Sequence, residues 1–291
     1  MDRKRFTERV KQSDAACFHY TGVVNVNTLW YVYVQILPFV APHLTQLADN
    51  VSLVLDSMEQ FLFTLVRVRT GSDLRFLSFL FGVSEEDGAL LFAVWTRFLA
   101  ELFSDLIVWP GPEAVAANLP ESFRRDFPQT VAVVDLAEYR VIGNSQSENE
   151  DCCDDAVVRQ LVCVMPTGCI TYVSDVCETD TDPKLFGFVD RLNPGEDVMC
   201  NRPRGWPGED RLKEMVLSKG ARLNIKCSSS STVPRQDHAN TLPSGVVSVA
   251  IERMKGFRIL GDVMPQSVRL QLNDVTKIVA FLSNLQPNIC R

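Results

Sequence analysis

The sequence predicts an α/β protein in which an N-terminal helical region precedes a domain built on a mixed β-sheet. The hydrophobic period changes near residue 127, from helical spacing over residues 28–126 to short β-branched runs after it. The chain has 291 residues, of which 46% are hydrophobic, so it is large enough to bury a core in each part. We therefore expect an N-terminal domain over residues 1–126 and a second domain over residues 127–291.

The N-terminal region contains a pattern typical of a helix-turn-helix unit near residues 56–103. Apolar residues recur along one face of its first helix at Met58, Phe61, Leu62, Leu65 and Val66. A short helix over Leu74–Phe81, a turn at Gly82 and a longer helix capped by Ser84 follow. Helix, short helix, turn and capped longer helix make up the helix-turn-helix order.

The second region predicts three strands, then a helix, a strand, a helix, a strand and a helix, which is the order of an RNase H-like fold. The strands are expected at Thr130–Asp135, Val157–Val164, Cys169–Ser174, Asp197–Cys200 and Arg222–Lys226, and the helices at Pro183–Leu192, Glu209–Lys219 and Val246–Arg258. Two polar stretches interrupt this order. Gly143–Ala156 carries five acidic residues and no basic one, and Ser228–Ser244 is rich in serine, so we expect both to be poorly ordered loops.

Charge and cysteine usage narrow the function classes. A net charge of −7 argues against nucleic-acid binding over the whole surface. Nine cysteines at irregular spacing, without a CxxC pair, indicate reduced thiols rather than a disulfide framework or a zinc site. The charged N-terminus predicts no signal peptide, and the apolar stretch Thr28–Ala41 is too short to span a membrane. We expect a nuclear or cytoplasmic protein.

Several segments, in the same order along residues 19–288, resemble Harbinger-like DDE transposases. The segments that carry the resemblance are Phe61–Arg69, Phe81–Ser84, Trp95, Phe127–Glu138, Pro166–Gly168, Thr171–Asp175, Arg222–Ile225, Glu252–Leu260 and Asn284–Pro287. The resemblance implies an endonuclease that acts on DNA with divalent Mg²⁺ or Mn²⁺. Such chemistry needs three carboxylates around two metal ions, which stabilise the attacking and the leaving oxygen.

This sequence keeps an acidic residue at only the first of the three positions that the resemblance implies. Asp135 matches the first carboxylate. Asn201 stands at the second, before an apparent insertion of two residues ahead of Gly205. Ser248 stands at the third, seven residues before the matching Lys255. Asp135 and Asn201 are the remaining candidate metal ligands, and a neutral amide supplies no charge to the site.

Three other acidic residues are candidates to compensate for the missing carboxylates. Glu252 lies one helical turn, roughly 5–6 Å, beyond Ser248. Asp197 precedes Asn201 by four residues, and Glu138 follows Asp135 by three. The alternative for each is an ordinary surface acid.

The expected recognition helix begins with Glu85, Glu86 and Asp87, which would face the phosphates of DNA. These acids equally suit the positive end of a helix. Two main hypotheses stay open: a metal-dependent DNA endonuclease, weakened or rescued by Glu252, and a domesticated, non-enzymatic scaffold for a protein partner. A decayed transposon copy is a third.

Overall fold

The computed structural model describes residues 2–48, 54–142, 156–225, 245–261 and 263–290. The chain divides into two compact units. The helical unit comprises Met1–Leu106 and Met254–Gln286, and the sheet unit comprises Ile107–Arg253 and Pro287–Arg291. The predicted loops Gly143–Ala156 and Ser228–Ser244 lie outside the described residues, except for Ala156.

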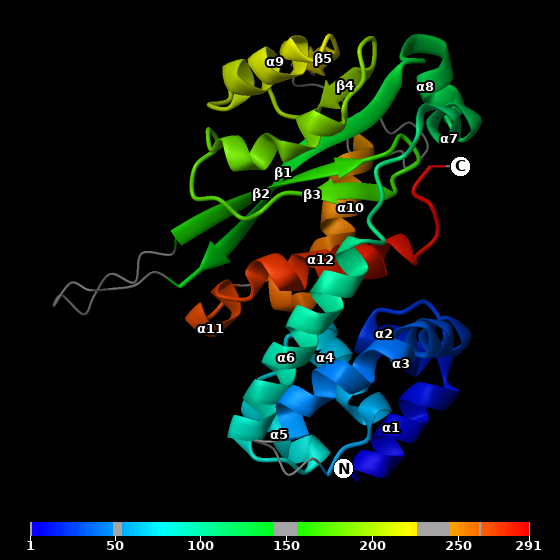
Figure 1. The fold of residues 1–291 in the computed structure, drawn as a ribbon, viewed down its shortest axis with the longest axis vertical. Coiled ribbons are helices and arrows are strands. Elements are labelled where there is room, and N and C mark those ends of the chain that lie inside the picture. The colour runs from blue at the N-terminus through cyan, green and yellow to red at the C-terminus, as the bar shows by residue number, and fades with distance from the viewer. Residues whose placement is uncertain (1, 49–53, 143–155, 226–244, 262, 291) are drawn as a thin grey trace, which may run out of the picture. The chain divides into compact units, whose positions relative to one another are not determined.

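The helical unit is built from helices that come from both ends of the chain (Figure 1). They are α1 (Arg3–Gln12), α2 (Asp14–Thr21), α3 (Val26–Ala48), α4 (Ser57–Thr70), α5 (Leu74–Phe81), α6 (Glu85–Ser104), α11 (Gln266–Arg269) and α12 (Leu272–Asn284), with the short 3₁₀ helix η3 (Arg258–Leu260). Helix α12 packs along α6, where the rings of Phe103 and Phe281 stack with centroids 4.0 Å apart. The single division expected at residue 126 therefore does not describe these units, because residues 254–286 return to the N-terminal helices.

Local signals set the ends of α4, α5 and α6, and the predicted turn at Gly82 and the predicted cap at Ser84 are confirmed. Asp56 and Glu59 form a reciprocal capping box at the start of α4, and Gly71 ends that helix in the left-handed conformation. Gly82 ends α5 in the same way, and the Ser84 hydroxyl accepts a hydrogen bond from the Asp87 amide at 3.0 Å to begin α6.

A buried glutamine amide, that of Gln60, lies in the core of the helical unit next to Trp95. The indole of Trp95 donates to Gln60 Oε1 at 2.8 Å, and the Gln60 amide nitrogen donates to the Leu55 carbonyl at 2.9 Å. Both ends of the buried amide are thereby satisfied. The aromatic side chains Phe61, Phe63, Phe81 and Phe103 are fully buried in the same unit. Each such burial contributes about 1.5–3 kcal/mol to stability.

The sheet unit is an α/β arrangement around a mixed five-stranded sheet (Figure 1). The strands are β1 (Thr130–Val141), β2 (Ala156–Val164), β3 (Ile170–Val173), β4 (Asp197–Cys200) and β5 (Arg222–Ile225), and their order is β3-β2-β1-β4-β5. The first three strands pair antiparallel, whereas β4 is parallel to β1 and to β5. The helices are α7 (Pro112–Ala117), α8 (Glu121–Asp126), the 3₁₀ helix η1 (Pro183–Arg191), α9 (Glu209–Ser218) and α10 (Val246–Lys255).

The central strand β1 determines where polar side chains can meet. Its first part is a continuous buried run, Val131–Val134, as the β-branched sequence predicts. The parallel ladder to β4 ends where Val134 pairs with Cys200, whereas the antiparallel ladder to β2 continues through Asp135 to Val141. Asp135 and the residue after β4 therefore lie side by side.

Two predicted helices differ from their expected form. Pro183–Arg191 is a 3₁₀ helix with a kink at Phe186, whose backbone leaves the helical region. The helix expected to reach Arg258 ends at Lys255, because Gly256 follows and Phe257 has an extended backbone before η3 begins.

Within the described residues, no single helix is long and apolar enough to cross a membrane. The helices Asp14–Thr21 and Val26–Ala41 meet that criterion only as a pair, and they are bent by 58°.

Candidate functional site

The three positions singled out in the sequence meet in one hydrogen-bonded group, which we call the Asp–Asn–Ser cluster. The Asn201 amide nitrogen donates to Asp135 Oδ2 at 2.8 Å and to Ser248 Oγ at 2.9 Å. These residues come from β1, from the end of β4 and from α10, and are separated by 66 and 47 positions. The fold therefore brings together residues that no local pattern links.

Asp135 is a largely buried carboxylate whose two oxygens have different partners. Its side chain is 12% exposed. Oδ1 accepts a hydrogen bond from the Leu136 amide at 2.8 Å, and Oδ2 accepts the Asn201 bond. The backbone N–H of Asn201 also donates to the Val134 carbonyl at 3.0 Å, which fixes Asn201 beside β1. Each oxygen of this carboxylate therefore accepts a hydrogen bond from a donor of the protein.

Two arginines that the sequence analysis did not single out lie next to the cluster. Arg202 contacts Glu138 at 3.0 Å and lies 3.9 Å from Asp135 Oδ1. Arg159 contacts Asp180 at 2.7 Å and Glu138 at 3.8 Å. We call Arg159, Arg202, Glu138 and Asp180 the arginine–carboxylate network.

The charges at this site nearly cancel. Asp135, Glu138 and Asp180 are three carboxylates, and Arg159 and Arg202 are two guanidinium groups, so a single negative charge remains in excess. A guanidinium near a carboxylate reduces the local negative potential that would otherwise attract a divalent cation.

The Asp–Asn–Ser cluster does not fit the two metal ions that the family resemblance implies. Asn201 supplies a neutral amide, whose nitrogen donates to Asp135, where the resemblance implies a second carboxylate. Oδ1 of Asn201 is buried without a hydrogen-bond partner. Over the described part of the chain, no group of three or more His, Cys, Asp or Glu side chains is arranged to hold a metal. Mg²⁺ requires oxygen ligands at nearly octahedral geometry, and one carboxylate with one hydroxyl does not supply them.

The other candidate residues lie apart from the hydrogen-bonded group. Glu252 is exposed on α10, and in the described structure its side chain has no hydrogen bond or ion pair. Asp197, at the start of β4, pairs with Arg222 at 2.6 Å. Lys255 belongs to the helical unit and is half-buried. Of the candidates for compensation, only Glu138 reaches the site, and there it binds arginine.

Cys200 directly precedes Asn201 in the chain, and its environment argues against a nucleophilic role. It is buried at the end of β4. Burial, reinforced by the charge of Asp135, raises the pKa of Cys200 to about 11 despite the Arg202 backbone hydrogen bond. The side chain is therefore a protonated thiol at neutral pH, the less reactive form.

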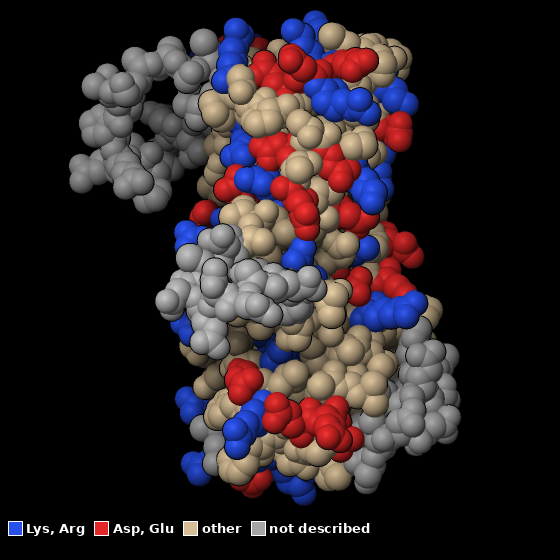
Figure 2. All heavy atoms as spheres, turned by 90° about the vertical axis from the view of Figure 1, so that its left-hand side faces the viewer, with Lys and Arg blue, Asp and Glu red and all other residues tan. Residues whose placement is uncertain are grey.

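A DNA-binding surface at α6 is opposed by its charge. Glu85 and Glu86 are exposed at the first turn of α6, and Asp87 is half-exposed beside them. On the sheet unit, basic and acidic side chains are interspersed across the face in the upper part of Figure 2. A phosphate backbone would meet charges of both signs on this face.

No protein-family model, no curated protein and no solved structure matches the chain.

Proposed function

We propose that this chain derives from a DDE-type transposase with an RNase H-like domain and no longer cleaves DNA. The observation that carries the proposal is the pair of hydrogen bonds from Asn201 to Asp135 and Ser248. The family resemblance, which depends on the sequence alone, implies that these three residues belong to one site. Their meeting in one cluster supports that ancestry.

The sheet order adds support for the RNase H-like assignment. The order β3-β2-β1-β4-β5, with three antiparallel strands followed by two parallel ones, is the arrangement expected for that fold. The succession of α4, α5 and α6 is consistent with an inherited helix-turn-helix unit. The acids in the first turn of α6 argue that DNA binding by this unit is weak.

Loss of cleavage follows from the donor set. Two-metal phosphodiester cleavage needs ligands that hold two cations against their mutual repulsion. Here Asn201 replaces a negative ligand with a hydrogen-bond donor, Ser248 replaces another with a hydroxyl, and Arg202 supplies positive charge beside Asp135. The cluster stabilises the sheet unit instead of binding metal.

A plasmid-nicking assay tests this proposal. Purified full-length chain, with supercoiled plasmid and Mg²⁺ or Mn²⁺, is expected to give no more nicked circles than an Asp135→Ala control. Metal-dependent nicking by the native chain that disappears in Asp135→Ala would contradict the proposal and make Glu252→Gln the next variant to assay.

Calorimetry with Mn²⁺ tests the inherited geometry separately. The double variant Asn201→Asp/Ser248→Glu is expected to bind Mn²⁺ more tightly than the native chain, because both replaced positions regain a carboxylate next to Asp135. Asn118→Asp/Ser218→Glu, with the same changes away from the cluster, is the matched control. Equal binding by both double variants would mean that the three positions never formed a metal site.

A second candidate function, a scaffold for a protein partner, is favoured by one observation. Helix α3 exposes several large apolar side chains, namely Trp30, Tyr31, Val34, Leu37 and Phe39, which are 41–67% exposed. Several large apolar side chains exposed on one helix are typical of a helix that contacts a protein partner. If α3 binds a partner, Val34→Glu should release the chain from a larger complex on sedimentation, whereas Val108→Glu in the sheet unit should not.

A further inference from the structure

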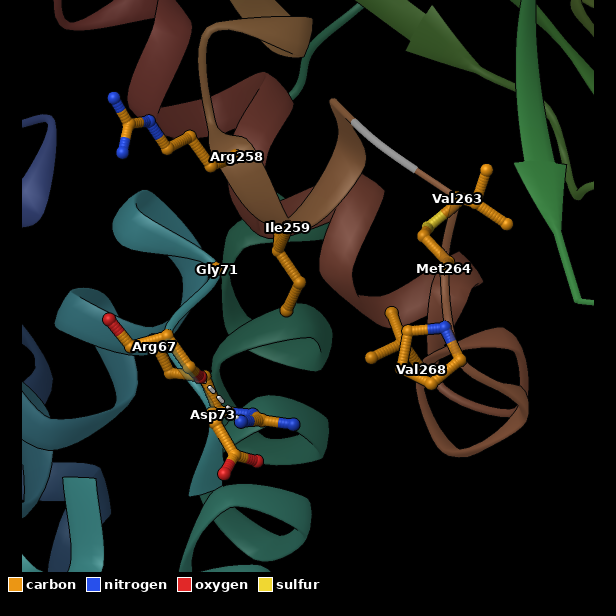
Figure 3. A pocket seen from close by; sticks show the side chains of 10 residues that line it. Arg67, Gly71, Asp73, Arg258, Ile259, Val263, Met264 and Val268 are labelled. Atoms are coloured by element: carbon orange, nitrogen blue, oxygen red, sulfur yellow. Dashed lines mark hydrogen bonds between the residues drawn. The ribbon is translucent and has the colours of Figure 1, made fainter. Parts of the chain in front are cut away.

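A pocket of about 260 Å³ lies within the helical unit, between the end of α4 and the chain that runs from η3 to α11 (Figure 3). It is lined by Arg67, Gly71, Ser72, Asp73, Arg258, Ile259, Val263, Met264, Pro265 and Val268. Gly71 packs closely against η3, since a Cβ there would lie 3.1 Å from the Arg258 backbone, and its φ of +63° also favours glycine. A benzene-sized ligand fits a cavity of roughly 150 Å³, so this pocket can hold a ring with one polar group attached.

Arg67 is the unusual residue of this pocket, because it is a buried cation without an anionic partner. The residue is only 7% exposed. Its Nη1 donates to the Ser72 carbonyl at 2.8 Å, and its guanidinium carbon lies 4.7 Å from the ring centre of Phe92. Its Nε is buried with no hydrogen-bond partner, and in the described residues no carboxylate lies within ion-pair distance. Burying a charge without a partner destabilises the folded state unless a group of opposite charge, such as a ligand, pairs with it.

The guanidinium remains charged under ordinary conditions. Burial lowers the pKa of Arg67 to about 10, and the nearby charge of Asp73 opposes that shift. At neutral pH the pocket therefore contains a permanent positive charge. Figure 3 shows the Arg67 side chain extending from α4 toward the wall that carries Val268.

The other residues that line the pocket determine the chemical character of the rest of an anionic ligand. Ile259, Met264 and Val268 are buried apolar side chains, so most of the ligand must be apolar. The Arg258 side chain points away from the pocket in Figure 3, and Asp73 is exposed. With one inward cation, the pocket suits a single negative charge, which a carboxylate supplies, whereas a phosphate monoester carries up to two.

We propose that this pocket binds a small organic monocarboxylate with an aromatic or branched aliphatic group, its carboxylate paired with Arg67 and its apolar part against Ile259, Met264 and Val268. The site is independent of the Asp–Asn–Ser cluster and does not depend on the ancestry proposed above.

Titration calorimetry and thermal denaturation of the full chain with benzoate test this inference. Benzoate at about 100 times its Kd should raise Tm by roughly 5 °C. Benzylamine and benzyl alcohol, which keep the ring but lack the carboxylate, should produce no shift. The carboxylate could also come from the C-terminal residue of a protein, which acetyl-leucine imitates. Tighter binding of acetyl-leucine than of benzoate would identify that C-terminal carboxylate as the preferred ligand.

Variants separate pocket binding from general effects. Arg67→Met should weaken benzoate binding about tenfold or more. Methionine keeps an unbranched side chain but lacks the charged guanidinium that would donate to the carboxylate. Val263→Trp should block the mouth of the pocket, whereas the control Leu217→Trp on α9 should leave affinity unchanged. Native-like circular dichroism is required of each variant. Absence of benzoate binding to the native chain, or equal binding by the native chain and a folded Val263→Trp variant, would overturn the proposal.

Discussion

In the sheet unit, Asp135 is buried as a carboxylate and is hydrogen-bonded to the Leu136 amide and to Asn201, with Arg202 nearby. In the helical unit, Arg67 is buried as a cation and makes one hydrogen bond to a backbone carbonyl, with no carboxylate paired to it in the described structure. Both side chains look equally unusual by burial alone. The difference lies in whether the protein itself supplies the compensating group, so an inward charge indicates a ligand only where that group is missing.

Removing Asn201 should have the largest effect on stability. Asn201→Leu abolishes both donations and leaves Asp135 Oδ2 without its donor, so we expect a loss of about 2–4 kcal/mol in the free energy of unfolding. Urea denaturation measures this change. Asn118→Leu, which removes an exposed amide that bonds only the Ala114 carbonyl, should cost well under 1 kcal/mol. Similar losses in the two variants would mean that the cluster does not bear on stability.

Arg67 should respond in the opposite way, and the difference should depend on pH. The folded pKa of about 10 lies below the ordinary arginine value. Above pH 10 the folded state releases a proton that the unfolded state keeps, so stability due to this residue rises with pH. The native chain should therefore gain about 1 kcal/mol relative to Arg67→Met between pH 8 and pH 10.5. Urea denaturation of both proteins at the two pH values makes the comparison. A native chain that gains no stability over this range would show that Arg67 keeps its proton in the folded state, as a paired arginine does.

The ion pair at the start of β4 should have the smallest effect. Arg222 is 63% exposed on its side chain, although it contacts Asp197 at 2.6 Å. Solvent screens such a pair, so Arg222→Gln should cost no more than about 0.5 kcal/mol. Urea denaturation at low and high salt gives this value. A loss of unfolding free energy close to that of Asn201→Leu would mean that the Asp–Asn–Ser cluster contributes no more to stability than an ordinary surface ion pair.

Local signals in the sequence predicted most of the elements. The caps at Asp56 and Ser84 and the glycines at 71 and 82 place helix ends without reference to distant residues. The buried run before Asp135 likewise identifies a central strand. The five strands and the helices α4, α5, α6, η1, α9 and α10 were predicted individually, which is why the α/β class was predictable, whereas α1, α2 and α12 were not.

Contacts between distant segments were only partly predictable. The family resemblance identified Asp135, Asn201 and Ser248, and the structure brings them together. It gave no sign that Arg202 would accompany them. The pairing of Arg159 with Glu138 required the β1–β2 register, in which these residues are direct partners. A correct β1–β2 register would therefore have predicted this cross-strand ion pair.

The pocket and the return of residues 254–286 to the helical unit lay beyond the sequence analysis. Arg67 follows the apolar face of α4 and looks like any arginine near a helix end. Its burial arises from Phe92 and from the segment around Ile259, which is nearly two hundred positions away. Hydrophobic periodicity shows that a face is buried but not what covers it.

The two ladders of β1 have a consequence for association between molecules. After Val134, β1 pairs only with β2 in the described structure, so its other backbone side ends as an edge over residues 136–141. A second chain could add a strand to such an edge and so begin aggregation. Glu138 and Arg140 are the exposed residues of this stretch, alternating with the buried Ala137, Tyr139 and Val141. A strand added here would have to accommodate charges of both signs at every second position. Glu138, which Arg202 contacts at 3.0 Å, is therefore also one of the two charged residues that disfavour pairing of this edge with another copy of the chain.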